Sequence, residues 1–309
     1  MKYSQWLDIW LENYVKPTSK IKTYTIYKQI VEKRLKPRLG EYGLNEISPV
    51  ILQCYVTELL RQGNAITGAG LSANTVNGII TVIQNSLKLA CTIGESEKYI
   101  AAKIKRPKTS EKEVSCFTVT EQKKIERAVL ADKRQKMFGI VLCLYTGLRI
   151  GELLALTWKD IDFIKGVLSV NKTIHDGNDE NGHFCSIIGV PKTQSSMRNI
   201  PLPKQLIPLL QKLKKQSDSV YVISDKGKGI SIRVYQRNFS KLLERSNIPH
   251  KGFHALRHTF ATRALECGMD VKTLSEILGH KSATVTLNRY VHSMADYKKE
   301  MMNKLGKLL

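Results

Sequence analysis

Two arginines in this sequence lie next to residues that can end or open a helix. Arg149 belongs to G-L-R-I-G-E (147–152), directly after the strongly apolar run 137–145. Gly147 is typical of the residue that ends a helix, and Arg149 would stand just beyond that end. Arg257 belongs to H-A-L-R-H (254–258), where it and His254 can reach one ligand from the same helix. Guanidinium and imidazole groups suit phosphate, although capping and solvent exposure also explain each motif taken alone.

Three further residues could add to this chemistry. Lys192 lies in the turn P-K-T-Q-S-S-M-R (191–198), His280 follows Gly279 in L-G-H at a predicted helix end, and Tyr290 follows in the next helix. Each has an ordinary explanation: an exposed lysine, a histidine favoured by the helix dipole, and a half-buried packing tyrosine. Five motifs in a fixed order, however, need one common explanation.

The composition favours a polyanionic partner. The 309 residues include 49 Lys and Arg against 27 Asp and Glu, a formal net charge of +22 that is spread along the chain. Such an excess favours nucleic acid first and an anionic membrane surface second. No apolar run reaches membrane-spanning length, and segment 1–16 lacks the clean apolar stretch of a signal peptide. The six cysteines form no C-x-x-C pair, so the sequence indicates neither a disulfide framework nor a zinc module. Scattered cysteines of this kind fit a reducing cytosol.

The length predicts two domains joined by a polar segment. The first domain, residues 1–106, shows helical patterns and no convincing strand: two apolar stripes, a helix opened by Ser48-Pro49, and a long helix starting at Ser72 or Asn74. Residues 107–116 begin with proline, are mostly polar and are predicted to be a linker. The second domain, residues 117–309, opens with a predicted capping box at Thr118 and Glu121.

The second domain mixes helices with short strands. The patterns predict a strand at 167–170, a polar loop at 175–182, and two strands near 187–193 and 198–202 joined by the turn K-T-Q-S-S. From Pro203 onward the chain is predicted to be helical, with one brief strand at 220–223.

The ordered set G-L-R-x-G-E, hairpin lysine, H-x-L-R-H, L-G-H and tyrosine resembles the tyrosine recombinase (phage integrase) family. The N-terminal segments W-L-E-N-Y-V-K and L-K-P-R-L-G-E-Y-G-L-N-E-I-S-P are similar to the family's core-binding domain, so the likeness spans most of the chain. Integrases of temperate phages and integrative conjugative elements are the most similar members. The resemblance implies a mainly α fold with a small antiparallel β-sheet, made of a helical SAM-like core-binding domain and an α+β catalytic domain.

The resemblance also assigns the site. It implies six catalytic residues, with Tyr290 as the nucleophile that attacks a DNA phosphodiester to give a 3′-phosphotyrosyl bond. The six are Arg149, Lys192, His254, Arg257, His280 and Tyr290. Glu152 is expected to orient this cluster through contacts with its residues, without contacting the phosphate itself.

Elementary chemistry is consistent with that assignment. Two arginine forks match the charge that gathers on a pentacoordinate phosphorus, and they stay protonated. A phenol with a pKa of about 10 needs help to lose its proton. Guanidinium charges favour the phenolate, His254 can accept the proton, and Lys192 can protonate the leaving 5′-oxygen. These groups replace a metal, and no cofactor is expected, because the carboxylates at 160, 162, 176, 179 and 180 are explained by turns and solvent.

The implied partners follow from the same resemblance. They are double-stranded DNA with core-type recombination sites and three further copies of the chain, in a tetramer that exchanges strands through a Holliday junction. The tail 294–309 is expected to dock on a neighbouring copy or on its own domain, and an accessory DNA-bending or directionality protein is possible. No membrane role is expected, and the expected location is the bacterial cytoplasm, at the nucleoid. Because core-binding helices start within the first residues, we expect no arm-site-binding domain ahead of them.

Two other classes of function stay open. A non-catalytic repressor or architectural protein on the same scaffold would be expected to lack at least one of the six residues, and none is missing. An enzyme that only nicks and reseals DNA, as type IB topoisomerases do, would relax a plasmid that lacks a specific site.

Overall fold

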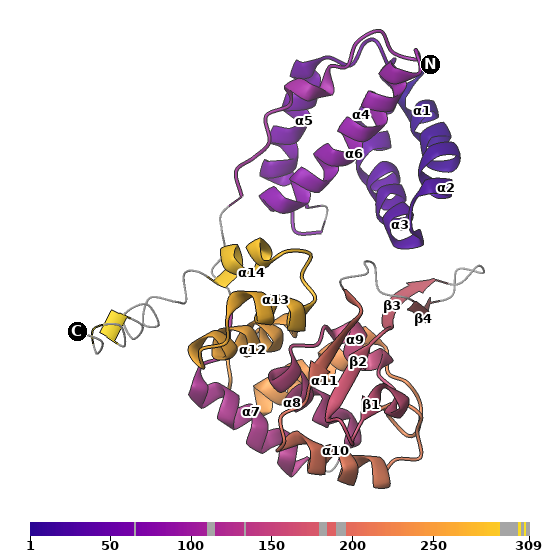
Figure 1. Cartoon of the computed structure of the whole chain (residues 1–309). Helices are drawn as coiled ribbons and strands as arrows, with labels where there is room; N and C mark the ends of the chain where they lie inside the picture. Colours follow the sequence, from indigo (N-terminus) through magenta and orange to yellow (C-terminus); the bar gives the residue numbers. More distant parts are fainter. Residues whose placement is uncertain are drawn as a thin grey trace. The chain divides into compact units, whose positions relative to one another are not determined.

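The computed structural model describes residues 1–64, 66–109, 115–132, 134–178, 184–189, 196–290, 302–303 and 306. The chain divides into two units, Met1–Lys112 and Glu113–Leu309 (Figure 1). The boundary lies inside the segment predicted to be a linker. The first residues of that segment still contact the first unit, because Asn77 Nδ2 donates to the Pro107 carbonyl at 3.1 Å.

The first unit is built from four long helical segments, as the sequence predicts. The first comprises α1 (Tyr3–Ile9), the π-helical turn η1 (Trp10–Val15) and α2 (Lys16–Thr18), which run on without a break. The second likewise comprises α3 (Ile21–Ile30), η2 (Val31–Leu35) and α4 (Lys36–Leu39). The others are α5 (Pro49–Gln62) and α6 (Ala73–Thr92), followed by the short turn η3 (Ala101–Lys103).

Caps and an aromatic core explain these helices. Ser48 Oγ accepts from the Ile51 amide, and Ser72 Oγ accepts from the Thr75 amide, so the two predicted starts are confirmed. Trp6 is buried, and its Nε1 donates to the Ser86 carbonyl at 3.0 Å, which joins α1 to α6. One hydrophobic core contains side chains from all four segments.

The second unit contains the remaining elements. Its helical elements are α7 (Val119–Ala131), η4 (Gln135–Met137), α8 (Phe138–Thr146), α9 (Ile150–Ala155), η5 (Trp158–Asp160), α10 (Leu206–Lys215), α11 (Ile232–Arg245), α12 (His254–Glu266), α13 (Val271–Leu278) and α14 (Ala283–Tyr290). Its strands are β1 (Ile161–Asp162), β2 (Val167–Val170), β3 (Thr173–Asn178), β4 (Phe184–Gly189) and β5 (Arg198–Pro201). The predicted capping box opens α7, since Thr118 and Glu121 exchange both hydrogen bonds.

The strands form two small antiparallel sheets, ordered β1-β2-β5 and β3-β4. Three predictions were wrong here. The segment 175–178, predicted to be loop, belongs to β3. The strands β4 and β5 were expected to pair with each other, but β4 pairs with β3 and β5 pairs with β2. The brief strand expected at 220–223 is a single bridge between Thr157 and Tyr221.

Helix α8 is the central helix of this unit. Every residue from Phe138 to Leu144 is buried, as is Thr146. The strands β1, β2, β3 and β5 and the helices α7, α9 and α11 supply other members of the same core. A separate small core joins α12, α13 and Tyr290. The end of α8, which holds the G-L-R turn, packs against Phe260 of α12 and Leu278 of α13.

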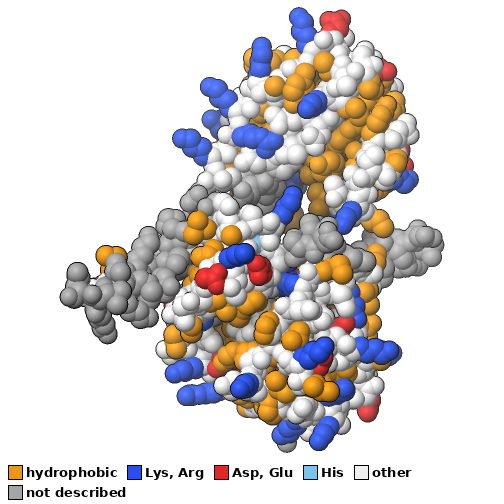
Figure 2. All heavy atoms as spheres, in the orientation of Figure 1, with side chains coloured by type: hydrophobic (Ala, Val, Ile, Leu, Met, Phe, Trp, Pro, Cys, Tyr) orange, Lys and Arg blue, Asp and Glu red, His pale blue; other side chains and the backbone are white. Residues whose placement is uncertain are grey.

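Lysine and arginine side chains are scattered over the visible face of both units, with few acidic side chains among them (Figure 2). Among the described residues, no helix is long and apolar enough to cross a membrane.

Candidate functional site

Gly147 ends α8 with a left-handed backbone, φ 64°, which glycine adopts without steric cost. A Cβ at this position would lie 2.5 Å from Phe260 Cδ1 and 2.9 Å from Leu278 Cδ2, so a side chain has no room. The turn places Arg149 immediately before α9, as its N-cap residue. The helix stops where the sequence predicts, and the arginine follows it directly.

Arg149 is held on two sides. Its Nη1 donates to Glu152 Oε1 at 2.7 Å, and its Nη2 donates to the Gly279 carbonyl at 3.0 Å. Its side chain nevertheless keeps 35% of its surface exposed. Arg149 is thus an oriented guanidinium that a ligand can still reach.

Arg257, on α12, is almost completely buried. Its Nη1 donates to the Gly147 carbonyl and its Nη2 to the Leu278 carbonyl, each at 2.7 Å. Burial, and then the positive charge of Arg149, lower the pKa of Arg257 to about 9. That value is still above neutrality, so the guanidinium stays charged at pH 7. The turn at Gly147 therefore presents one arginine and anchors the other.

A third arginine, Arg198, joins the cluster, and the sequence analysis assigned it no role. It is the first residue of β5, and its side chain is only 6% exposed. Its Nη2 donates to Glu152 Oε2 at 2.9 Å, and its Nε donates to the Ile277 carbonyl. Nothing in the neighbouring sequence distinguishes a buried arginine from an exposed one. Only the alternation of inward-facing and outward-facing residues along the strand could have indicated that Arg198 is buried.

The three arginines meet at the last residues of α13. The carbonyls of Ile277, Leu278 and Gly279 accept from Arg198, Arg257 and Arg149 in turn. These carbonyls lack partners within the helix, and the negative end of the helix dipole lies there. Gly279 adopts φ 64°, which ends α13 and exposes this row of acceptors. The end of α13 thus aligns three cations from three other elements.

Glu152 is the carboxylate that Arg149 and Arg198 share. It is buried, which by itself would raise its pKa, but the hydrogen bonds from Arg198 and the charges of Arg198 and Arg149 outweigh burial and lower the pKa. Glu152 is therefore ionised at neutral pH. Three guanidinium groups against one carboxylate leave a net positive cluster that suits a tetrahedral anion.

Tyr290, at the end of α14, is buried with 2% of its surface exposed. Its hydroxyl lies 2.7 Å from His258 Nδ1, and the His258 ring packs edge-on against that of His254, with ring centroids 4.6 Å apart. Tyr290 also lies close enough to Arg257 for its negative form to raise the pKa of that guanidinium. His258 is thus the imidazole that contacts the tyrosine. No role was predicted for it from the sequence, although its place one residue after Arg257 could have indicated that it belongs to the site.

His280 follows the end of α13 and is half-buried. Its Nδ1 lies 2.7 Å from Thr286 Oγ1, and Thr286 is completely buried in α14. The histidine therefore connects the arginine-bearing end of α13 to the helix that carries Tyr290.

The structure brings together five of the six predicted residues around the ends of α8, α12, α13 and α14. The sixth, Lys192, lies outside the described residues, as does nearly all of the predicted tail 294–309.

Two of the carboxylates that the sequence analysis attributed to turns and solvent, Asp160 and Asp176, have structural partners. Asp160 accepts from Thr157, Lys172 and Asn171. Asp176 accepts from Ser186 Oγ and from the first amides of α11. In the described part of the chain, no group of three or more His, Cys, Asp or Glu side chains could hold a metal ion.

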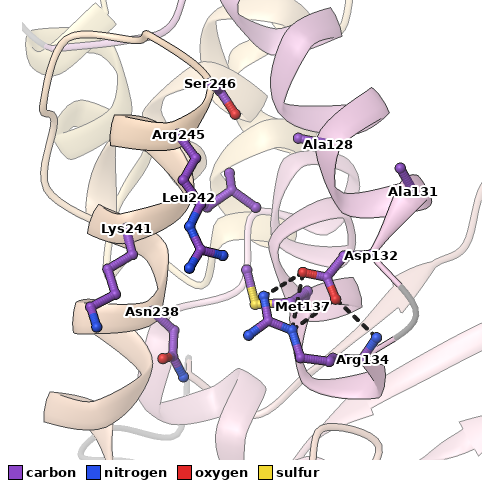
Figure 3. Close-up of a pocket in the computed structure, with 10 residues that line it drawn as sticks. All are labelled: Ala128, Ala131, Asp132, Arg134, Met137, Asn238, Lys241, Leu242, Arg245 and Ser246. Atoms are coloured by element: carbon purple, nitrogen blue, oxygen red, sulfur yellow. Dashed lines mark hydrogen bonds and ion pairs between the residues drawn. The ribbon is translucent and has the colours of Figure 1, made fainter.

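A hollow of about 370 Å³ lies between α7, η4 and α11 (Figure 3). Arg134 and Asp132 form an ion pair on one wall, and Lys241 and Arg245 extend from α11 on the other. The hollow is lined by Met137, directly before α8, so it lies at the opposite end of that helix from Gly147, about 14 Å away at 1.5 Å per residue. None of the predicted site residues that the structure describes lines it.

Two protein-family models match the chain. The one described as "Phage integrase family" covers residues 117–296, and the one described as "Phage integrase, N-terminal SAM-like domain" covers residues 2–60. A relative from Caldanaerobacter subterraneus subsp. tengcongensis, "Tyrosine recombinase XerC-like", is 31% identical over 98% of this chain and 82% of its own length. The "ICEBs1 integrase" of Bacillus subtilis is 26% identical over 94% of this chain and 79% of its own.

Solved structures share the fold. The Tn1549 transposon integrase in complex with circular intermediate DNA superposes with a TM-score of 0.81 at 24% identity, covering 99% of this chain and 100% of that one. A lambda integrase tetramer bound to a Holliday junction superposes with a TM-score of 0.70 at 22% identity, covering 92% of this chain and 79% of that one.

Proposed function

Because the chain belongs to the phage integrase family of tyrosine recombinases, enzymes that cleave and rejoin DNA strands, we propose that it is a site-specific recombinase of a mobile element. Its substrate is duplex DNA that carries a core-type recombination site. Tyr290 forms a 3′-phosphotyrosyl intermediate, and the outcome is integration or excision of the element. The names of the relatives, which include integrases of a conjugative element and of a phage, support the mobile-element role.

The observation that carries this proposal is the meeting of Arg149 and Arg257 at the end of α13, beside the Tyr290–His258 pair. Backbone carbonyls orient both guanidinium groups, and donors with a fixed direction stabilise the charge that develops on a phosphate. In this proposal Arg149 and Arg257 hold the non-bridging oxygens of the scissile phosphate. His280 donates a further hydrogen bond to that phosphate.

The chemical step balances without a cofactor. The Tyr290 oxygen forms a bond to phosphorus as the bond from phosphorus to the 5′-oxygen breaks. The tyrosine proton passes to an imidazole. His254 is the acceptor predicted from the sequence, and His258 is the one within 2.7 Å of the hydroxyl, so separate variants decide between them. Lys192 gives a proton to the leaving 5′-oxygen, and attack by a 5′-hydroxyl on the phosphotyrosine reverses each step.

We also propose that the active assembly is a tetramer on two DNA sites that exchanges strands through a Holliday junction. The lambda integrase tetramer bound to such a junction supports this, since the fold is shared. The tail 294–309 docks on a neighbouring copy, and deleting the residues after Met294 is expected to weaken tetramers while sparing the folding of the monomer. An unchanged assembly would refute the role of the tail. An accessory DNA-bending or directionality protein sets the outcome, at the bacterial nucleoid.

Covalent trapping tests the chemistry. The probe is a duplex enriched from a random pool by repeated binding to Tyr290→Phe, and then nicked at successive positions across the protected region. Cleavage beside a nick releases a short strand, which prevents rejoining and preserves the covalent complex. The wild type is expected to give a covalent band on a denaturing gel, in EDTA as well as in Mg²⁺, and Tyr290→Phe is expected to give none.

Each alternative predicts a different result. A duplex that is bound without a covalent band would point to a non-catalytic DNA-binding protein. Relaxation of a plasmid that lacks the enriched site would point to an enzyme that only nicks and reseals. A band that persists in Tyr290→Phe would mean that another residue is the nucleophile.

A further inference from the structure

Arg198 connects three parts of the candidate site. Its Nη1 donates to the Ser196 carbonyl and to Glu152 Oε1, both at 3.1 Å, and its Nη2 donates to Glu152 Oε2 at 2.9 Å. Its Nε donates to the Ile277 carbonyl. One guanidinium therefore joins the segment before β5, the helix α9 and the end of α13.

Each oxygen of the Glu152 carboxylate accepts hydrogen bonds from both Arg149 and Arg198. Oε1 accepts from Arg149 Nη1 and Arg198 Nη1, and Oε2 accepts from the Arg149 amide and Arg198 Nη2. Arg198 takes both oxygens at once, which fixes the plane of the carboxylate. Because the same carboxylate fixes Nη1 of Arg149, the direction of Arg149 depends on Arg198.

The bond to the Ser196 carbonyl adds a second connection. Ser196 lies four residues after Lys192 in the sequence, in the segment that leads into β5. The guanidinium that orients Arg149 therefore also holds the backbone at Ser196, two residues before β5.

We propose that Arg198 is a positioning residue for strand cleavage, which orients Arg149 through Glu152. This inference rests on the proposed function. In the mechanism Arg198 acts through Glu152 and has no contact with DNA. Burying a cation is costly, and an apolar side chain of similar size often serves the fold equally well. The orientation that Arg198 imposes on Glu152 and Arg149 explains why an arginine stands at this position.

The proposal predicts a change in the pH dependence of cleavage. The charged or titratable groups around Glu152 are Arg149, Arg198, Arg257 on α12 and the Cys143 thiol on α8. Burial pushes the pKa of Glu152 up, and Arg198 is the main group that pushes it down. In Arg198→Met the pKa of Glu152 therefore rises, and protonation at acidic pH releases Arg149. The rate of cleavage by Arg198→Met is therefore expected to fall at acidic pH, as Glu152 becomes protonated. In the wild type Glu152 stays ionised over the same pH range, so its protonation does not lower the rate there.

The test measures single-turnover formation of the covalent complex on the nicked duplex, at saturating DNA, together with DNA affinity and thermal stability. Arg198→Met is expected to bind DNA like the wild type and to cleave about 10²-fold more slowly, because small misplacements of reacting groups cost that much. Arg198→Lys, which keeps the charge but loses the fork, is expected to recover part of that rate. The double variant E152Q/R198M is expected to lose the acid-side fall.

Arg263→Met is the matched control. Arg263 lies on the same helix as Arg257, pairs with Glu266 and donates to the Phe117 carbonyl at 3.0 Å, but forms no hydrogen bond or ion pair with Glu152 or α13 among the described residues. Its replacement removes an arginine with a carboxylate and a carbonyl partner, and the cleavage rate is expected to stay at the wild-type value.

The outcomes separate the two proposals. A wild-type protein that binds the duplex without forming a covalent complex would overturn the proposed function and this inference with it. Wild-type cleavage together with an equal rate and pH profile in Arg198→Met would overturn the inference alone. If Arg198→Met does not fold, a wild-type rate in Arg198→Lys would overturn the inference in its place.

Discussion

Two groups of arginines lie at opposite ends of α8 and use their charge differently. At the C-terminal end, Arg149, Arg198 and Arg257 all donate to helix-end carbonyls, and Arg149 and Arg198 also donate to the buried Glu152. At the N-terminal end, Arg134 pairs with Asp132 beside an open hollow, and half of its side chain is exposed (Figure 3). Both groups contain arginines and a carboxylate, so the residue types alone do not distinguish them.

The difference between the two groups lies in the acceptors. Backbone carbonyls at the end of a packed helix cannot turn away, so the guanidinium groups that they hold keep their direction. The Arg134 pair is partly exposed to solvent, where a charge pair contributes little and salt screens it. The net charge of +22 attracts DNA whatever the positions of the individual charges on the chain. Only guanidinium groups with a fixed direction, however, can bind one phosphate in a defined geometry.

The largest effect is expected from Arg257→Met. It removes a guanidinium that is fixed by the Gly147 and Leu278 carbonyls, and formation of the covalent complex is expected to slow at least about 10³-fold, or about 4 kcal/mol in the barrier. Arg245→Met, at the other end of α8, is the control and is expected to keep the wild-type rate. Equal losses in the two variants would mean that general charge, not fixed geometry, drives cleavage.

The next effect is on stability, at Gly147. Gly147→Ala is expected to lower the free energy of unfolding by about 3 kcal/mol, because it combines a left-handed backbone with a clash against Phe260 and Leu278. Gly268→Ala has a similar backbone, φ 88°, but no atom within 4 Å of the added Cβ, and about 1 kcal/mol is expected. Urea unfolding compares the two. A smaller loss at Gly147 than at Gly268 would contradict the packing argument.

A smaller effect is expected from the pH dependence of Glu152. Its pKa in the folded protein is below the ordinary value of 4.5, so its contribution to stability is fully present above about pH 4.5 and is lost as the pH falls through the folded pKa. Unfolding measured from neutral pH downward is expected to be less pH-dependent in Glu152→Gln than in the wild type. Identical slopes in the two proteins would show that other carboxylates carry the acid sensitivity.

The smallest effect is expected from Arg134→Ala. The pair with Asp132 is partly exposed, so the expected loss of stability is below about 1 kcal/mol, and it shrinks further as salt is added. The rate of covalent complex formation is expected to be unchanged. A slower rate in this variant would mean that the two ends of α8 are coupled.

Local signals in the sequence predicted a large part of this structure. The caps at Ser48, Ser72 and Thr118 and the glycine turn at Gly147 depend on neighbours within a few residues, and all four were found. The family resemblance and the fold class were confirmed as well, because an ordered set of motifs is much more specific than any one of them.

The errors arise where distant residues decide. The segment 175–178 is polar and turn-like, yet it forms a strand because β4 pairs with it and because Asp176 accepts from the first amides of α11. The pairing of β5 with β2 has no local signal. Arg198 could not be recognised for the same reason, since its acceptors at Glu152 and Ile277 lie 46 and 79 positions away.

The row of acceptors at 277–279 has a consequence for protein synthesis. Arg149, Arg198 and Arg257 all leave the ribosome before the carbonyls that orient them, so a nascent chain that stops short of Ile277 carries every cation of the cluster and none of the three helix-end acceptors. A growing chain that already attracts DNA through its charge cannot yet align these guanidinium groups. Synthesis of three consecutive residues then supplies all three helix-end carbonyls at once.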